Sequence, residues 1–248
     1  MAQALVPLKD LVLAKTRLSG VLTSVERRAL AQAMVEDVLA VLSSHQHITR
    51  ITLVSDDPGA SMLAQKYGAD CWTESSLGCR GLNPLIQCAS ERLLAAGEEP
   101  LVVLHGDLPL LTREDIDLVL ASQQALNGLI VGCDSKGVGT NLLAFNAAST
   151  PRFCFGADSC AAHIAGAKNT GVAVQILQRS GIGLDVDEAP DLQCIMDELH
   201  VNTASNTAQL LYNTELGARV TLALTAMMGD TESGGADLID EVKRGIAS

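Results

Sequence analysis

The sequence predicts an α/β fold in which a mostly parallel central sheet carries helices on both faces. Over the first 200 residues, short apolar runs alternate with segments of helical periodicity, the pattern of repeated strand–helix–strand units. The run Leu101–Leu104 is apolar at all four positions, as expected for a strand buried on both faces. The chain has 248 residues, 48% of them hydrophobic and 19% charged, so it can form a globular domain with a large core.

The expected elements begin with a strand at Ala4–Leu8. Thr23 and Glu26 have the spacing of a capping box, and aliphatic residues then recur every four positions, which predicts a helix over Ser24–Ser44. The remaining elements are expected at Ile51–Val54 (strand), Ala60–Tyr67 (helix, closed by Gly68), Leu85–Ala96 (helix), Leu101–Leu104 (strand), Thr112–Ser122 (helix), Leu129–Val131 (strand), Leu142–Phe145, Ala157–Lys168, Val172–Leu177 and Pro190–Leu199 (helix).

Two regions of different character divide the chain. Residues 1–200 form the main domain by this pattern, and residues 201–248 form a C-terminal appendage. Within the appendage, 202–207 is polar and resembles a linker, whereas Val220–Leu224 fits either a helix or a strand. After Gly234 and Gly235, residues 238–246 fit a short amphipathic helix. We expect the appendage to pack on the main domain or on a partner subunit.

Charge and cysteine usage exclude several classes of protein. With 17 Lys and Arg against 29 Asp and Glu, the formal net charge is −12, which disfavours non-specific binding to nucleic acid or anionic membranes. There is no apolar run of about 18 residues and no basic leader before an apolar stretch, so neither a membrane span nor a signal peptide is expected. Seven cysteines without a C-x-x-C pair predict reduced thiols and a cytoplasmic protein, not a zinc site or a disulfide framework. Cys133 fits a small buried apolar residue.

A cationic segment follows the first predicted strand. Lys9, Lys15 and Arg17 fall within nine residues of an otherwise acidic chain. In an open α/β sheet this loop lies at the edge where ligands bind, so these side chains can hold a polyphosphate. The alternative is that they only solvate a surface loop.

Three carboxylates stand where a metal site is expected. Asp107 follows the buried strand Leu101–Leu104, with Gly106 before it to permit close approach. Asp185 and Asp187 point to the same side if the backbone between them is extended. Together they can hold one or two Mg²⁺ ions, because Mg²⁺ prefers a few carboxylates together with substrate phosphates. The alternative is that Asp107 caps a turn and the other two solvate a strand end.

Two further segments suit an anion. The loop Asp134–Asn141 contains two glycines and can present backbone amides, but it lacks the order of residues of a P-loop. Gly156 and Ser159 precede or open a predicted helix, whose free amides can bind a phosphate or carboxylate. An ordinary turn and a plain helix cap are the alternatives. His163 lies one turn beyond Ser159 and is left outside the catalytic set, because a lone helical histidine is more often structural.

Taken together, these segments resemble the CofC/FbiD family of guanylyltransferases in coenzyme F-420 biosynthesis. The resemblance covers roughly residues 5–199 and implies a Rossmann-like GT-A nucleotidyltransferase fold, a guanylyltransferase that releases pyrophosphate, Mg²⁺ as cofactor and a homodimer. Its motifs, in chain order, are Lys9 with Ala14–Leu18, Leu82–Asn83, Gly106–Pro109, Gly139–Asn141, Phe155–Gly156 with Ser159 and His163, and Asp185–Asp187.

The resemblance also implies a role for each matching position. Asp107, Asp185 and Asp187 would hold Mg²⁺ and, with Lys15, carry the catalysis. Lys9, Lys15 and Arg17 would bind the GTP triphosphate, with Asn83 near the guanine. Thr140, Gly156 and Ser159 would bind the acceptor, a small phosphorylated acid: phosphoenolpyruvate, 2-phospho-L-lactate or 3-phospho-D-glycerate.

Two departures from the family and two rival functions stay open at this point. The segment Cys154–Phe155 borders the acceptor site and varies within the family, and the shorter relatives lack the region after about residue 200. One rival is another enzyme of this fold, of the molybdenum-cofactor or sugar-phosphate type. The sugar-phosphate type begins with a glycine-rich loop, whereas this chain has no glycine before Gly20. The other rival is a non-catalytic nucleotide-binding protein.

Overall fold

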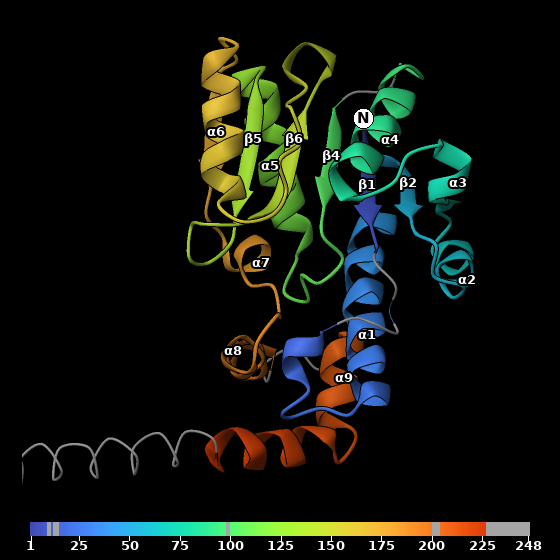
Figure 1. The fold of residues 1–248 in the computed structure, drawn as a ribbon, viewed down its shortest axis with the longest axis vertical. Coiled ribbons are helices and arrows are strands. Elements are labelled where there is room, and N and C mark those ends of the chain that lie inside the picture. The colour runs from blue at the N-terminus through green and yellow to red at the C-terminus, as the bar shows by residue number, and fades with distance from the viewer. Residues whose placement is uncertain (9–10, 12–14, 98–99, 200–203, 227–248) are drawn as a thin grey trace, which may run out of the picture.

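One mostly parallel sheet organises the protein. The computed structural model describes residues 1–8, 11, 15–97, 100–199 and 204–226. In this part of the chain, the strands form a sheet of order β3-β2-β1-β4-β6-β5-β7 (Figure 1). Strand β6 is antiparallel to β4 and β5, and the other neighbouring strands of the described sheet run parallel. The strands are β1 (Ala2–Pro7), β2 (Ile48–Val54), β3 (Asp70–Trp72), β4 (Leu101–Leu104), β5 (Leu129–Cys133), β6 (Thr140–Phe145) and β7 (Val174–Leu177).

Helices cover both faces of the sheet, as predicted. Alternate side chains of β1 enter two different cores: Ala4 and Val6 pack with α1, α2 and α5, whereas Leu5 packs with α4 and α6. This alternation is the strand period of two. The helices are α1 (Ser24–Ser43), α2 (Ala60–Lys66), α3 (Glu74–Leu77), α4 (Leu82–Leu94), α5 (Arg113–Leu126), α6 (Ser159–Asn169), α7 (Ser180–Gly183), α8 (Ala189–Leu199) and α9 (Asn206–Tyr212), with 3-10 turns η2 (Thr16–Leu18) and η3 (Ala147–Ser149).

The predicted start of α1 is confirmed in detail. The Thr23 hydroxyl accepts a hydrogen bond from the backbone N–H of Glu26, and the Glu26 carboxylate accepts one from the N–H of Thr23 at 2.8 Å. This reciprocal pair satisfies two amides that the helix itself cannot bond. The helix ends at Ser43, one residue before the predicted end.

The described part of the appendage packs on α1. The buried carboxylate of Asp37 accepts hydrogen bonds from the backbone N–H groups of Asn206 and Thr207, at 2.6 and 3.0 Å, and so caps α9. Residues 216–226 are helical, which resolves the open choice between helix and strand at Val220–Leu224. Leu216, Val220 and Leu224 share a core with α8 and α9. The predicted helix over 238–246 lies outside the described residues, and the domain boundary at 200 stays a prediction.

Among the described residues, the sequence analysis missed one short strand, two short α-helices and the two 3-10 turns. Strand β3 has three residues, and helices α3 and α7 have four each. Segments of this length hold too few residues to show a hydrophobic period, so pattern reasoning could not detect them.

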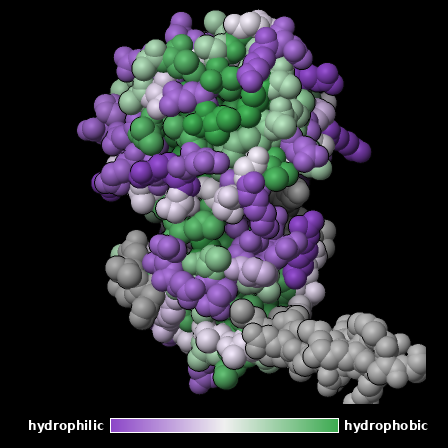
Figure 2. All heavy atoms as spheres, turned by 90° about the vertical axis from the view of Figure 1, so that its left-hand side faces the viewer, coloured by the Kyte–Doolittle hydropathy of each residue, from purple (hydrophilic) through white to green (hydrophobic). Residues whose placement is uncertain are grey.

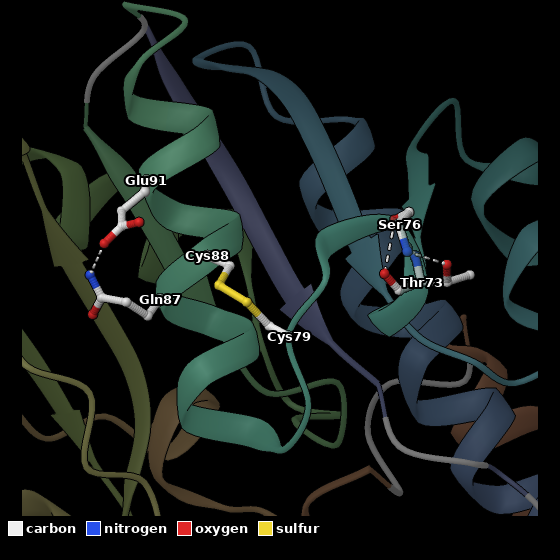
Figure 3. The surroundings of a disulfide bond; sticks show 6 residues. All are labelled: Thr73, Ser76, Cys79, Gln87, Cys88 and Glu91. Atoms are coloured by element: carbon white, nitrogen blue, oxygen red, sulfur yellow. Dashed lines mark hydrogen bonds between the residues drawn. A yellow bond between two sulfur atoms is a disulfide. The ribbon is translucent and has the colours of Figure 1, made fainter.

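The prediction that all seven thiols are reduced is wrong for four of them. Cys79 is joined to Cys88, and Cys133 is joined to Cys160, while Cys71, Cys154 and Cys194 are free. The first disulfide ties the turn before α4 to the second turn of that helix (Figure 3). The second joins the end of β5 to the first turn of α6. These contacts depend on a folded-back turn and on helix–sheet packing, neither of which cysteine spacing reveals.

The surface has an apolar area on the side of the edge strand β7 (Figure 2). Figure 2 faces the side of the molecule that lies on the left in Figure 1, where β7 is the edge strand, and it shows an apolar area framed by hydrophilic side chains in the upper part. Ile176 of β7 is 47% exposed.

Among the described residues, no helix is both long enough and apolar enough to cross a membrane.

Candidate active site

The site lies at the edge of the sheet where β1 and β4 end and β6 begins. Because β6 is antiparallel to β4, the start of β6 reaches the same edge as the carboxyl end of β4. Leu104 pairs with Leu142 there, and the N–H of His105 donates to the carbonyl of Asn141 at 3.0 Å. This places the segment that follows β4 beside the first residues of β6.

Gly106 lets the end of β4 pass close to α1. A Cβ atom at this position would lie 2.9 Å from a methyl group of Val35. The close approach that the sequence suggested for this glycine is therefore present, and Asp107 follows at the sheet edge.

Three carboxylates meet at this edge. One oxygen each of Asp107, Asp185 and Asp187 lies within 4.8 Å of the others. In the part of the chain that the structure describes, no other group of three or more His, Cys, Asp or Glu side chains brings its potential ligand atoms this close together. Such close like charges repel each other strongly unless a cation lies among them.

Lys15 supplies a positive charge to this cluster. Its ammonium group donates hydrogen bonds to Asp107 and, at 3.0 Å, to Asp187. Burial disfavours the charged amine, but Asp107 and Asp187 outweigh burial and raise the pKa of Lys15. The backbone of Lys15 is left-handed, with φ 57° and ψ 39°, a costly conformation for a residue other than glycine. The chain thus holds a strained turn where Lys15 meets the carboxylates.

The carboxylates of Asp107 and Asp185 have different environments. Burial alone would raise the pKa of Asp107, but Lys15, and then His105, outweigh burial and hold it below its ordinary value. For Asp185, burial and the neighbouring Asp107 raise the pKa. The side-chain amide of Asn141 partly opposes this rise, since it donates to Asp185 at 3.1 Å and to the carbonyl of Ile182 at 3.0 Å.

Asn141 is a site residue to which the sequence analysis gave no role. It lies in β6, is 3% exposed, and uses its amide to orient Asp185. A polar residue inside an otherwise apolar strand was the available signal, because a buried amide needs a specific partner.

Of the two remaining cations assigned to the triphosphate, the structure describes Arg17. Arg17 is mainly exposed and pairs with Glu188 at 3.2 Å, one residue beyond Asp187. Lys9 lies outside the described residues.

The residues assigned to the acceptor lie together around the start of α6. The backbone N–H of Cys160 donates to the carbonyl of Val138 at 3.0 Å, which joins this helix to the turn before β6. Thr140 and Ser159 are each 2% exposed, whereas Gly156 is exposed and has a φ of 136°. Their role in acceptor binding stays a prediction.

Asn83 and His163 hold the segment between Phe153 and Gly156. Asn83 bonds both backbone groups of Phe155, its oxygen accepting at 2.7 Å and its amide donating at 3.0 Å. His163 bonds Cys154 and Thr140. The proposed place of Asn83 near a guanine stays a prediction, and the structure shows its carboxamide engaged by Phe155.

The glycine-containing loop Asp134–Asn141 is closed by its own aspartate. The Asp134 carboxylate accepts from the N–H of Val138 at 2.7 Å, and its carbonyl accepts from Gly137 at 3.0 Å. These two amides are therefore engaged within the loop, which favours the interpretation of this loop as a turn between β5 and β6.

Comparison with known proteins gives one family. A model described as "Guanylyl transferase CofC like" matches residues 2–225. The phosphoenolpyruvate guanylyltransferase of Conexibacter woesei is 33% identical over 78% of this chain and 86% of its own length. The corresponding enzyme of Chloroflexus aggregans is 35% identical over 76% and 93%. The 3-phospho-D-glycerate guanylyltransferase of Phenylobacterium zucineum is 33% identical over 77% and 88%.

Solved structures show the same fold. A putative nucleotide-diphospho-sugar transferase from Desulfovibrio desulfuricans G20 superimposes with a TM-score of 0.75 at 19% identity, covering 90% of this chain and 97% of that one. CMP:2-keto-3-deoxy-manno-octonic acid synthetase, complexed with CTP, gives a TM-score of 0.53 at 10% identity, covering 81% and 98%. The predicted nucleotidyltransferase type of fold is confirmed by these neighbours.

Proposed function

Since this chain belongs to the CofC-like guanylyl transferase family, we propose that it transfers GMP from GTP to a small phosphorylated carboxylic acid and releases pyrophosphate. The relatives bear the names of phosphoenolpyruvate and 3-phospho-D-glycerate guanylyltransferases, and these two acids, with 2-phospho-L-lactate, are the acceptors we propose. The product would serve coenzyme F-420 biosynthesis. The observation that carries the proposal is the cluster of three carboxylates bonded to Lys15 at the sheet edge.

The carboxylate cluster fits Mg²⁺. Oδ1 of Asp107 is buried and has no hydrogen-bond partner among the described residues, so it has an oxygen to offer a cation. All three groups supply the hard oxygen ligands that Mg²⁺ prefers. We therefore propose that Asp107, Asp185 and Asp187 hold Mg²⁺, which when bound would neutralise phosphate charge.

The protein's own contribution to the reaction is binding and charge neutralisation. An oxygen of the acceptor phosphate forms a bond to the α-phosphorus of GTP, and the bond from that phosphorus to the pyrophosphate oxygen breaks. We propose that Lys9, Lys15 and Arg17 hold the triphosphate in line for this attack. No general base is required, because a phosphate monoester is already ionised near neutral pH.

Pyrophosphate release from the purified protein tests the proposal. GTP and Mg²⁺ are supplied with each of the three acids in parallel, and ATP and CTP serve as nucleotide controls. Release with GTP and one acid is expected. Release only with a sugar phosphate or a molybdopterin would indicate the rival nucleotidyltransferases, and GTP binding without turnover would indicate a nucleotide-binding protein.

Two variants test the carboxylate cluster. Asp107→Asn and Asp185→Asn should stay folded but lower kcat by several orders of magnitude. Asp197→Asn is the matched control, because Asp197 is an exposed carboxylate of α8 outside the cluster. Near-normal turnover in either cluster variant would sink the assignment.

Assembly and location complete the proposal. Family resemblance supports a homodimer, which light scattering on the purified protein would test. The consumption of GTP supports a cytoplasmic location, whereas the two disulfides do not.

A further inference from the structure

His163 is a buried histidine that connects three elements around the acceptor site. It is 1% exposed and lies on α6. Its Nδ1 is 3.1 Å from the hydroxyl of Thr140 at the start of β6, and its Nε2 is 3.0 Å from the backbone nitrogen of Cys154. Its ring meets the ring of Phe155 edge-on, with 5.1 Å between centroids. The mechanism proposed above assigns it no task.

The contact with Cys154 determines where the proton of the imidazole lies. A backbone N–H can only donate, so Nε2 must accept with a free lone pair. A neutral ring then carries its hydrogen on Nδ1. Burial lowers the pKa of His163 to about 4, although a backbone hydrogen bond with Ser159 opposes the shift. The ring is therefore neutral near pH 7.

This tautomer decides the direction of the bond with Thr140. Because Nδ1 bears a hydrogen, the Thr140 hydroxyl can accept from it but cannot donate to it. Among the described residues, His163 is the one hydrogen-bond partner of this hydroxyl. The hydroxyl proton of Thr140 is therefore left for another acceptor.

The segment that sets the tautomer is itself held firmly. Asn83, on α4, bonds the backbone N–H and carbonyl of Phe155. The stacked ring of Phe153, 6.3 Å from that of Phe155, and the tilted ring of His105, at 5.3 Å, pack beside it. The N–H of Cys154 is thus kept in place to donate to His163.

We propose that His163 is a positioning residue of the acceptor site: with its hydrogen on Nδ1, it turns the Thr140 hydroxyl into a hydrogen-bond donor toward the anionic acceptor. The proposal rests on the proposed function, which places the phosphorylated acid at Thr140, Gly156 and Ser159. A donor suits this partner, because phosphate and carboxylate oxygens only accept.

The tautomer can be measured without any turnover. Long-range ¹H–¹⁵N correlation NMR of ¹⁵N-histidine protein at about pH 7 distinguishes the two ring nitrogens, and His163→Phe identifies the signal. We expect hydrogen on Nδ1 alone. Hydrogen on Nε2, or a charged ring, would overturn the proposal even if the enzyme is a guanylyltransferase. Conversely, the expected tautomer in a protein without GTP turnover would leave the ring geometry correct and the proposed function wrong.

Two amide variants separate the two bonds of the ring. The terminal nitrogen of asparagine occupies the place of Nδ1, so His163→Asn keeps a donor to Thr140. The terminal oxygen of glutamine occupies the place of Nε2, so His163→Gln keeps only an acceptor for Cys154. We expect His163→Gln to raise the KM of the acceptor about tenfold or more, the range for a hydrogen bond to a charged group, with the KM of GTP unchanged. His163→Asn should stay within about threefold of wild type.

Thr140 variants complete the test. Thr140→Val should raise the acceptor KM like His163→Gln, and Thr140→Ser should restore it. In the Thr140→Val background, His163→Gln should have no further effect on the acceptor KM, because both changes remove the same hydrogen bond, the one between His163 and Thr140. Additive effects, or equal acceptor KM values for the Asn and Gln variants, would overturn the proposal.

Discussion

If Asp107, Asp185 and Asp187 hold a divalent cation as proposed, Lys15 and this cation compete for the same carboxylate groups. The ammonium group bonds Asp107 and Asp187, two of the three groups proposed to hold Mg²⁺. In the absence of GTP, a Mg²⁺ ion bound at these carboxylates would weaken both bonds and would be repelled by the ammonium group of Lys15. We therefore predict that Lys15→Met binds Mg²⁺ more tightly than wild type in the absence of GTP, even though it should lose turnover.

The size of this effect follows from the two ion pairs. Asp187 has a side chain that is 53% exposed, so its pair with Lys15 contributes little, about 0–1 kcal/mol. The pair with Asp107 is more buried, with side-chain exposures of 8% and 23%, and a hydrogen bond to a charged group contributes about 1.5–3 kcal/mol. If about 2 kcal/mol of the interaction of Lys15 with these two carboxylates must be given up when Mg²⁺ binds, removing Lys15 tightens Mg²⁺ binding about 30-fold.

Isothermal titration of Mg²⁺ into GTP-free protein measures the change. Arg17→Met is the matched control: it removes one positive charge from the same segment, but the Arg17 side chain is 69% exposed and pairs with Glu188. The control should change Mg²⁺ affinity less than about threefold. Equal or weaker Mg²⁺ binding by Lys15→Met, compared with wild type, would refute the competition.

Three further changes test other parts of the structure. Asn141→Leu removes the amide that orients Asp185 and should lower Mg²⁺ affinity or turnover about 10–100-fold; kinetics like wild type would contradict this role. Burial alone would raise the pKa of Glu36, but hydrogen bonds from Gln32 and from the ammonium group of Lys66 outweigh burial and hold this pKa below 4.5. The ionised Glu36 therefore stabilises the fold fully above about pH 4.5, and this stabilisation is lost as pH falls through the lowered pKa. Urea unfolding should show Glu36→Gln to be destabilised at about pH 7, with a difference from wild type that shrinks as the pH is lowered below 4.5. Replacing Cys79 and Cys88 by serine should destabilise the protein by about 2 kcal/mol, unless non-reducing peptide maps show these cysteines unpaired.

The fold was largely predictable because its main elements carry strong local signals. The capping box at Thr23 and the apolar run Leu101–Leu104 each define an element without knowledge of the rest of the chain. The direction of β6 was not predictable, since a buried strand has the same composition in either orientation. That direction matters for function, because it brings Thr140 and Asn141 to the edge where β4 ends.

The candidate site was predictable in its residues more than in their contacts. Asp185 and Asp187 follow each other at a spacing of two, and a sheet edge is where such side chains converge. The partners of Asn83 and His163, in contrast, lie 72 and 23 residues away in sequence. Only the folded chain shows that the side-chain amide of Asn83 holds Phe155 beside the acceptor residues. Likewise, only the folded chain shows that the backbone N–H of Cys154 sets the tautomer of His163.

The pairing of Lys15 with the carboxylates also explains how an acidic protein tolerates this site. Three carboxylates within 4.8 Å oppose folding if no cation lies among them. Lys15 provides that cation, even at the cost of a left-handed backbone at φ 57°. If the carboxylates hold Mg²⁺ as proposed, the ammonium group of Lys15 would be free to contact the triphosphate of GTP. We infer that Lys15 stabilises the site when neither GTP nor Mg²⁺ is bound, and binds the substrate when both are present. Loss of Lys15 should therefore lower the stability of the GTP-free protein most when Mg²⁺ is withheld.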